Sequence, residues 1–173
     1  MVWRQFKVVL ILPGSVLVLV PAVILWFTSN TDFAARYLGP VDPGFWVGAI
    51  CGVIGLGFAL WTVRLFVVRG GGTPAPWDPP QQLVIRGPYR HVRNPMIYSV
   101  YMMLLAESLM LNALSIAIWL AVFFLLNAVY IPRSEEKALE AQFGETYLRY
   151  KANVPRWLPN PFPWNPDEAG DNA

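Results

Sequence analysis

Four apolar runs separated by polar segments make up most of the chain, and each of them predicts a helix. The runs cover approximately residues 8–27, 45–68, 96–111 and 113–131. A helix of about 20 apolar residues crosses the hydrocarbon core of a bilayer, so three of the runs have the length of a membrane span. The third run is short for a span unless it is tilted or extended by the turn before it. The pattern therefore predicts an all-α polytopic membrane protein with about four transmembrane helices.

Local signals define where these helices begin and end. Asp42-Pro43 and Asn94-Pro95 each place a side-chain acceptor before a proline, which is the pattern of a helix cap followed by a first-turn proline. Asn112 separates the last two runs, so the third and fourth helices should form an antiparallel hairpin. Small residues in the second run should allow another helix to approach closely: Gly52, Gly55 and Gly57.

The pattern becomes amphipathic after Pro132. Apolar side chains recur at helical spacing, opposite charged residues, at Leu139, Phe143, Tyr147 and Tyr150. This spacing predicts an amphipathic surface helix that leaves the fourth span, with a break at Gly144. The prolines and tryptophans that follow are typical of an interfacial segment, and residues 160–173 are predicted to be a tail, disordered from Asp167 onward.

Composition supports the membrane interpretation. The chain is 55% hydrophobic and only 14% charged, whereas a soluble domain carries about 25% charged residues. The net charge of +2 gives no reason to expect a nucleic-acid partner. Cys51 is the single cysteine and lies in an apolar run, so it is interpreted as a packing residue and an internal disulfide is excluded.

The basic residues lie on one side of the four-helix arrangement. They fall near the N-terminus, between the second and third runs, and after the fourth, while the loops of the opposite side carry only Arg36. The positive-inside rule therefore places both termini and the polar segments in the cytoplasm, with the inner membrane as the location if the source is bacterial.

Two polar stretches, residues 81–98 and 127–150, flank the predicted hairpin and should meet at its cytoplasmic end. One histidine, His91, cannot form a zinc site, and no metal-ligand spacing is present. The triplet Gly70-Gly71-Gly72 lacks the Gly-Lys-Ser/Thr that a phosphate loop needs. The stretches do combine guanidinium, carboxylate and aromatic groups, which suit a zwitterionic cofactor with an aromatic base: Arg90, Arg93, Arg133, Glu135, Glu136, Tyr89, Tyr98 and Tyr147.

A combined motif extends through residues 81–159. It comprises Gly87-Pro88-Tyr89, Arg93-Asn94-Pro95-Met96, Glu135-Glu136, Leu139, Phe143-Gly144, Tyr147, Tyr150 and Val154-Pro155-Arg156. This motif resembles the isoprenylcysteine carboxyl methyltransferase and phospholipid methyltransferase family of membrane enzymes, which use S-adenosylmethionine. The predicted organisation is a single membrane domain over residues 1–173, with two anchor helices in 1–68, a cofactor-binding half in 81–159 and the tail.

The resemblance implies which residues contact the cofactor. Tyr89 corresponds to the family's tyrosine after the glycine, and Glu135 to its cofactor-binding glutamate. Backbone contacts would come from an extended segment formed by Gln81, Gln82, Leu83 and Val84. The family's His-Pro-x-Tyr element corresponds to Asn94, Pro95, Met96 and Ile97. Asn94 replaces its histidine, Ile97 replaces its tyrosine, and Tyr98 stands one place later.

Arg133 and Asn127 are predicted to be the catalytic residues, on the acceptor side. The arginine that prenylcysteine enzymes use for substrate has no counterpart at Ile131, and Arg133 is close but shifted. Asn127 lies on one helical face with Ile131 and Glu135, where it would line the deep part of the pocket or form an interhelical hydrogen bond.

Several polar residues also have structural interpretations. Asn94 would cap the third helix, Arg90 and Arg93 would be positive-inside anchors, and His91 would be interfacial. Glu107 lies inside the third run, where a carboxylate indicates a functional role or a buried polar network.

The sequence thus predicts a membrane methyltransferase that uses S-adenosylmethionine and a lipophilic acceptor. Prenylcysteine, a phospholipid amine and small thiols are all open as acceptors. One alternative is an NADPH-dependent membrane reductase of the steroid-reductase type. The other is a non-enzymatic helical membrane scaffold.

Overall fold

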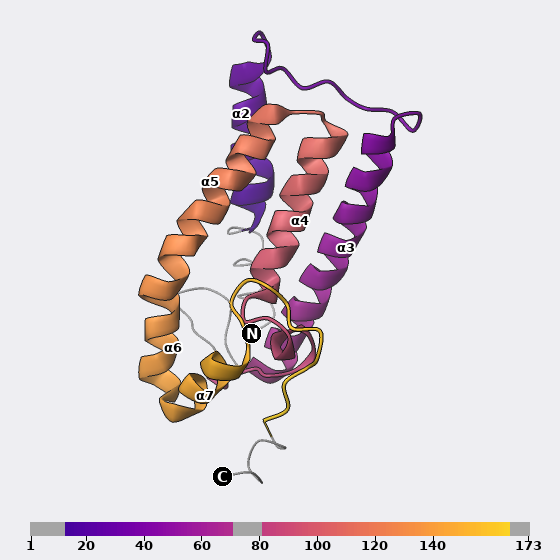
Figure 1. Cartoon of the computed structure of the whole chain (residues 1–173). Coiled ribbons are helices and arrows are strands. Elements are labelled where there is room, and N and C mark those ends of the chain that lie inside the picture. Colours follow the sequence, from indigo (N-terminus) through magenta and orange to yellow (C-terminus); the bar gives the residue numbers. More distant parts are fainter. Residues whose placement is uncertain (1–12, 71–80, 167–173) are drawn as a thin grey trace.

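Figure 1 shows the computed structural model of the chain, which describes residues 13–70 and 81–166. All regular structure in these ranges is helical, as predicted. The elements are η1 (Ser15–Leu19), α2 (Val20–Thr28), α3 (Pro43–Leu65), η2 (Phe66–Gly70), η3 (Gly87–Arg90), α4 (Pro95–Met110), α5 (Leu114–Tyr130), η4 (Ile131–Glu135), α6 (Glu136–Phe143) and α7 (Glu145–Asn153). Of these, η1, η2 and η4 are π-helical and η3 is a 3₁₀ turn.

The four longer apolar helices form one bundle. α4 packs between α3 and α5, and α2 packs against α5 (Figure 1). The link after α2 and the α4–α5 turn lie at one end of the bundle, joined by backbone hydrogen bonds from Arg36 to Leu111 (2.8 Å) and from Leu38 to Met110 (3.0 Å). The segment around η3, the helices α6 and α7, and the chain after them lie at the other end (Figure 1).

The helix boundaries follow the local signals, although the capping side chains do not act as predicted. α3 begins at Pro43 and α4 at Pro95. Neither Asp42 nor Asn94 makes a side-chain capping hydrogen bond; Asp42 Oδ2 instead accepts one from the Gly39 N–H (3.0 Å). The hairpin break is confirmed at Asn112, whose φ of 44° is a left-handed conformation that asparagine tolerates better than most residues.

Two helical stretches are long and apolar enough to cross a membrane: α3, and the continuous stretch Leu114–Phe143. In the second stretch the charged residues begin at Arg133, so we take α5 as its membrane-spanning part. The helices Ser15–Thr28 and Pro95–Met110 are apolar but shorter. Residues 8–12, which belong to the first predicted run, lie outside the described ranges.

Glycines bring α3 and α4 close together. A Cβ atom at Gly55 would lie 3.0 Å from the Ser99 carbonyl oxygen, and one at Gly48 would lie 2.6 Å from an α4 side chain. A Cβ at Gly52 would make an ordinary 3.5 Å contact, whereas Gly57 has nothing within 4 Å. The predicted approach is therefore confirmed at Gly52 and Gly55. Gly57 does not contribute, and Gly48 was not predicted.

We expect Gly55→Val to destabilise the protein by about 1–3 kcal/mol, because the added carbons overpack the α3–α4 contact. Gly57→Val is the matched control, since it introduces the same residue into the same helix at a site with nothing within 4 Å. The midpoint of thermal unfolding in a non-ionic detergent measures both. An equal loss in the two variants would show that valine in this helix, rather than the helix contact, causes the effect.

Candidate functional site

The charged end of the bundle is built around Glu136, whose side chain is 2% exposed. Its Oε1 atom accepts hydrogen bonds from Arg93 Nη1 (2.9 Å) and Arg156 Nε (2.7 Å), and its Oε2 atom accepts one from Arg156 Nη2 (2.7 Å). Lys151 Nζ lies 3.7 Å from Oε2 and also pairs with Glu140. Glu136 therefore joins the loop before α4, the end of α7 and the segment after α7.

The partners of Glu136 keep it ionised. Burial alone would raise its pKa, but the hydrogen bond from Arg156 and the charges of Arg93, Arg156 and Lys151 outweigh burial and hold the pKa below its ordinary value. A buried carboxylate with several cationic partners depends on all of them, because removal of one side leaves uncompensated charge in the interior. This geometry makes Glu136 a structural residue.

Glu135 precedes Glu136 but has a different environment. Its side chain is half-buried and makes no hydrogen bond or ion pair within residues 13–70 and 81–166. Burial, and then the neighbouring charge of Glu136, raise the pKa of Glu135 above its ordinary value. Burial raises the pKa values of Tyr89 and Tyr147, and the charge of Glu135 raises both further. A partly buried carboxylate without a partner is suited to receive a cationic group from a ligand.

Tyr89 lies in η3 and is buried close to this carboxylate. Its ring packs against Phe66, with 5.7 Å between ring centroids, and its backbone oxygen accepts a hydrogen bond from Tyr150 Oη (2.7 Å). Burial, and then the nearby Tyr150 and Glu135, raise the pKa of Tyr89. The turn is possible because Gly87 adopts a φ of 55°. Tyr89, which precedes α4, and Glu135, which follows α5, are thus close enough to interact electrostatically.

Two pairs of hydrogen bonds join the chain after α7 to Arg90, the last residue of η3, and to His91, which follows it. Backbone N–H groups of Asn160 and Trp164 donate to the carbonyls of His91 (2.8 Å) and Arg90 (2.9 Å). In return, His91 Nδ1 donates to the Asn160 carbonyl (2.7 Å) and Arg90 Nε to the Trp164 carbonyl (2.8 Å). His91 therefore holds the segment around Asn160 in place. Residues 160–164 of the predicted tail are docked, while Asp167 and beyond lie outside the described ranges.

The first turn of α4 carries several of the predicted cofactor residues. Pro95 is buried, and Asn94, Met96, Ile97 and Tyr98 are half-buried. The Nδ2 atom of Asn94 is buried and has no hydrogen-bond acceptor among the described atoms. Asn94 does stand at the N-cap position of α4, but the predicted side-chain capping hydrogen bond is not formed. Leaving a buried donor unpaired costs about 1–3 kcal/mol, which an acceptor on a ligand would recover.

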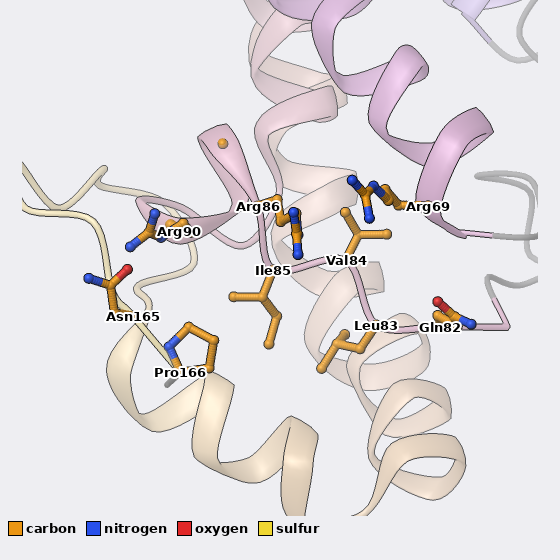
Figure 2. Close-up of a pocket in the computed structure, with 10 residues that line it drawn as sticks. Arg69, Gln82, Leu83, Val84, Ile85, Arg86, Arg90, Asn165 and Pro166 are labelled. Carbon is orange, nitrogen blue, oxygen red and sulfur yellow. The ribbon is translucent and has the colours of Figure 1, made fainter. Parts of the chain in front are cut away.

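The segment Gln81, Gln82, Leu83 and Val84 has no regular secondary structure. The two glutamines are exposed, Leu83 is half-buried and Val84 is buried. Leu83 and the following Ile85 pack against the cluster of Tyr147, Tyr150 and Val154. A pocket of about 670 Å³ opens beside the segment, and Figure 2 shows Gln82, Leu83 and Val84 among the residues that line it.

The remaining predicted residues are Asn127 and Arg133, which were assigned to the acceptor, and Glu107. Asn127 is largely buried and its Nδ2 atom donates to the Phe123 carbonyl (2.7 Å) in its own helix. Arg133 is exposed and has no salt bridge within the part of the chain that is described. Glu107 lies in the last turn of α4, at the opposite end of the bundle, so the structure does not place it at the site.

Sequence reasoning missed the residues that hold Glu136. Arg156 and Lys151 lie 20 and 15 positions after it, and no helical spacing relates a glutamate to such distant partners. Val154-Pro155-Arg156 belonged to the combined motif, and that was the one signal for Arg156. In the sequence, only the family resemblance distinguished the two adjacent glutamates, because it assigned cofactor binding to Glu135.

Comparison with known proteins identifies the family. A model described as phospholipid methyltransferase matches residues 43–146, which is more than half of the chain. The match begins with α3 and ends in α7, so it includes Tyr89, Asn94, Glu135 and Glu136. No curated protein and no solved structure matches the chain. The chain therefore belongs to the phospholipid methyltransferase family, and it is a membrane methyltransferase.

Proposed function

We propose that this protein transfers the methyl group of S-adenosylmethionine to a lipophilic acceptor at the cytoplasmic surface of a membrane. Members of its family generally use this cofactor. The observation that most supports a site in this chain is Glu135, a half-buried carboxylate with no partner in the described part of the chain and with Tyr89 within its electrostatic reach.

The chemical groups of the predicted site residues suit those of the cofactor. The Glu135 carboxylate would accept hydrogen bonds from the ammonium group, and a charge-assisted bond of this kind is stronger than a neutral one. The unpaired Asn94 Nδ2 would donate to a cofactor oxygen or ring nitrogen. Tyr89 would offer an aromatic surface, the backbone of Gln81–Val84 would supply further contacts, and Pro95 to Tyr98 would border the site. When bound, the cofactor would supply a sulfonium methyl group for in-line transfer to a nucleophilic acceptor, with the neutral thioether as the leaving group.

The contribution of the chain to this reaction is orientation and exclusion of water. The Glu136 network fixes the start of α6, and Glu135 is the preceding residue of the same continuous helix. The buried cluster of Tyr147, Tyr150 and Val154 packs against Leu83 and would help to exclude water from the proposed cofactor segment. A carboxylate or thiolate acceptor needs only this alignment, whereas a protonated amine acceptor must first lose a proton.

We further propose that η1 with α2, and then α3, α4 and α5, span the membrane as four helices. The positive-inside rule supports a cytoplasmic position for the end of the bundle that contains η3, α6 and α7. That end carries Arg64, Arg69, Arg86, Arg90, Arg93, Arg133, Lys137, Arg149, Lys151 and Arg156, whereas the described loops at the other end carry one basic residue, Arg36. Both termini would then be cytoplasmic, at the inner membrane in a bacterium.

The acceptor would approach between α4 and α5. Tyr101 packs against Phe123 and Phe124 there, with ring centroids 5.8 and 5.7 Å apart, and forms an apolar wall suited to a lipophilic molecule. Asn127 and Arg133 are proposed as acceptor-side residues. The Nδ2 atom of Asn127 is occupied by a backbone carbonyl, which leaves its Oδ1 atom for the acceptor.

Titration calorimetry of the purified protein in detergent tests the cofactor. We expect heat from S-adenosylmethionine and none from NADPH. Binding of NADPH without binding of S-adenosylmethionine would favour a reductase instead. A protein that binds neither would match the scaffold alternative.

We expect the affinity for S-adenosylmethionine to increase as the pH is raised from acid to neutral. The pKa of Glu135 is raised by burial, so this carboxyl is still partly protonated just above the ordinary pKa near 4.5, and only the ionised form pairs with the ammonium group. Calorimetric titrations across this pH range measure the effect. The dependence should disappear in Glu135→Gln; if it persists there, another group is responsible.

A further inference from the structure

A basic pocket lies beside the extended segment that precedes η3. It measures about 670 Å³, and three of its lining residues are arginines. Arg69 comes from the end of the helix that continues α3, Arg86 from the extended segment, and Arg90 from η3 (Figure 2). Three guanidinium groups from separate parts of the fold thus border one cavity.

Among the described residues, these arginines have no anionic partner of the kind that other arginines of the site possess. Arg93 and Arg156 are bonded to Glu136, whereas Arg69 and Arg86 make no hydrogen bond or salt bridge with any described residue. Arg90 uses its Nε atom on the Trp164 carbonyl, which leaves its Nη groups available. No carboxylate is among the described residues that line the pocket. Like charges gathered in a pocket whose described lining holds no carboxylate favour binding of an anion.

The position of the pocket favours a phosphate carried by a lipid. Arg69 is four residues beyond Leu65, the last residue of the apolar helix α3, which is about one helical turn. The cavity therefore opens where a helix of membrane-spanning length ends, at the level of the lipid head groups. Guanidinium groups bind phosphate oxygens in pairs, and basic pockets at the cytoplasmic ends of transmembrane helices hold anionic head groups.

We propose that Arg69, Arg86 and Arg90 bind the phosphate of an anionic phospholipid head group at the cytoplasmic membrane surface. The proposal rests on the membrane orientation given under the proposed function, but not on methyl transfer. Glu135 and Tyr89 do not line this pocket, so the lipid site is separate from the ammonium-binding carboxylate. It shares Gln82, Leu83 and Val84 with the proposed cofactor segment, so the two sites adjoin.

Three soluble probes test the proposal on the full chain in a non-ionic detergent without cofactor. They are a short-chain phosphatidic acid, the matching diacylglycerol that lacks phosphate, and inorganic phosphate. We expect phosphatidic acid to raise the midpoint of thermal unfolding, diacylglycerol to have no such effect, and inorganic phosphate to act only at much higher concentration. Arg69→Gln combined with Arg86→Gln should weaken the apparent affinity for phosphatidic acid about tenfold or more.

The matched control is Lys137→Gln combined with Arg149→Gln, which removes the same charge from exposed positions of α6 and α7. This control should bind phosphatidic acid like the unmodified protein. Equal weakening in both double variants, equal stabilisation by diacylglycerol, or equal potency of inorganic phosphate would each overturn the lipid site. A protein that binds cofactor but not phosphatidic acid contradicts only this inference, and one that binds phosphatidic acid but not cofactor contradicts only the proposed function.

Discussion

Glu136→Gln is expected to reduce the free energy of unfolding by about 3–5 kcal/mol, because breaking a buried ion pair leaves its partner charges uncompensated. The substitution keeps the size of the side chain but removes the charge that faces Arg93, Arg156 and Lys151. Denaturant or thermal unfolding in detergent measures the loss. This loss should exceed the loss expected for Gly55→Val.

Glu140→Gln is the matched control for this prediction. Glu140 also pairs with Lys151, but its side chain is 29% exposed, and exposed pairs contribute about 1 kcal/mol or less. A loss in Glu136→Gln no larger than in this control would contradict the structural role of Glu136.

The stability contributed by Glu136 should also depend on pH. Because its folded-state pKa is lowered, this contribution is complete above the ordinary pKa near 4.5 and is lost as the pH falls through the lowered value. The unmodified protein should therefore lose more stability below this pH than Glu136→Gln does.

Glu135→Gln is expected to weaken binding of S-adenosylmethionine by about 10–100-fold, since a hydrogen bond to a charged group contributes about 1.5–3 kcal/mol. The fold should tolerate the change, because Glu135 has no ion pair in the described structure and its raised pKa means that burial opposes its charge. Calorimetry measures the affinity and thermal unfolding measures the stability of the same preparation.

The two adjacent glutamates serve as controls for each other. The account requires that Glu135→Gln loses cofactor affinity with its stability unchanged or increased. Undiminished cofactor binding in Glu135→Gln, or a loss of stability equal to that of Glu136→Gln, would show that their roles have been assigned wrongly.

The helices were predictable because their signals are local. Pro43 and Pro95 start α3 and α4 where the sequence indicated, and Asn112 breaks the hairpin. Apolar runs of the right length predicted the bundle, and the short spacing between the last two runs predicted their antiparallel pairing. The approach of α3 to α4 was only partly predictable, because which glycine faces the partner depends on the rotation of both helices. Gly48 and Gly55 face α4, whereas Gly57 does not.

The site was less predictable because its defining contacts are long-range. Arg93 lies 43 positions before Glu136, and Arg156 lies 20 positions after it. Composition and spacing describe both glutamates equally well. Only the fold reveals that Glu136 is bonded to arginines, whereas Glu135 has no such partner among the described residues. As the single histidine, His91 was a candidate for a chemical role. Its hydrogen bond to the Asn160 carbonyl could not be predicted, because Asn160 belongs to the segment that was predicted to be a tail.

Transfer of a labelled methyl group into lipid tests the central claim most directly. The purified protein in detergent would be incubated with methyl-labelled S-adenosylmethionine and a membrane lipid extract, with Glu135→Gln in parallel. We predict that the unmodified protein places label in a lipid-soluble product and that Glu135→Gln places far less. An extract that stays unlabelled with the folded, unmodified protein, or equal labelling by Glu135→Gln, would contradict the account.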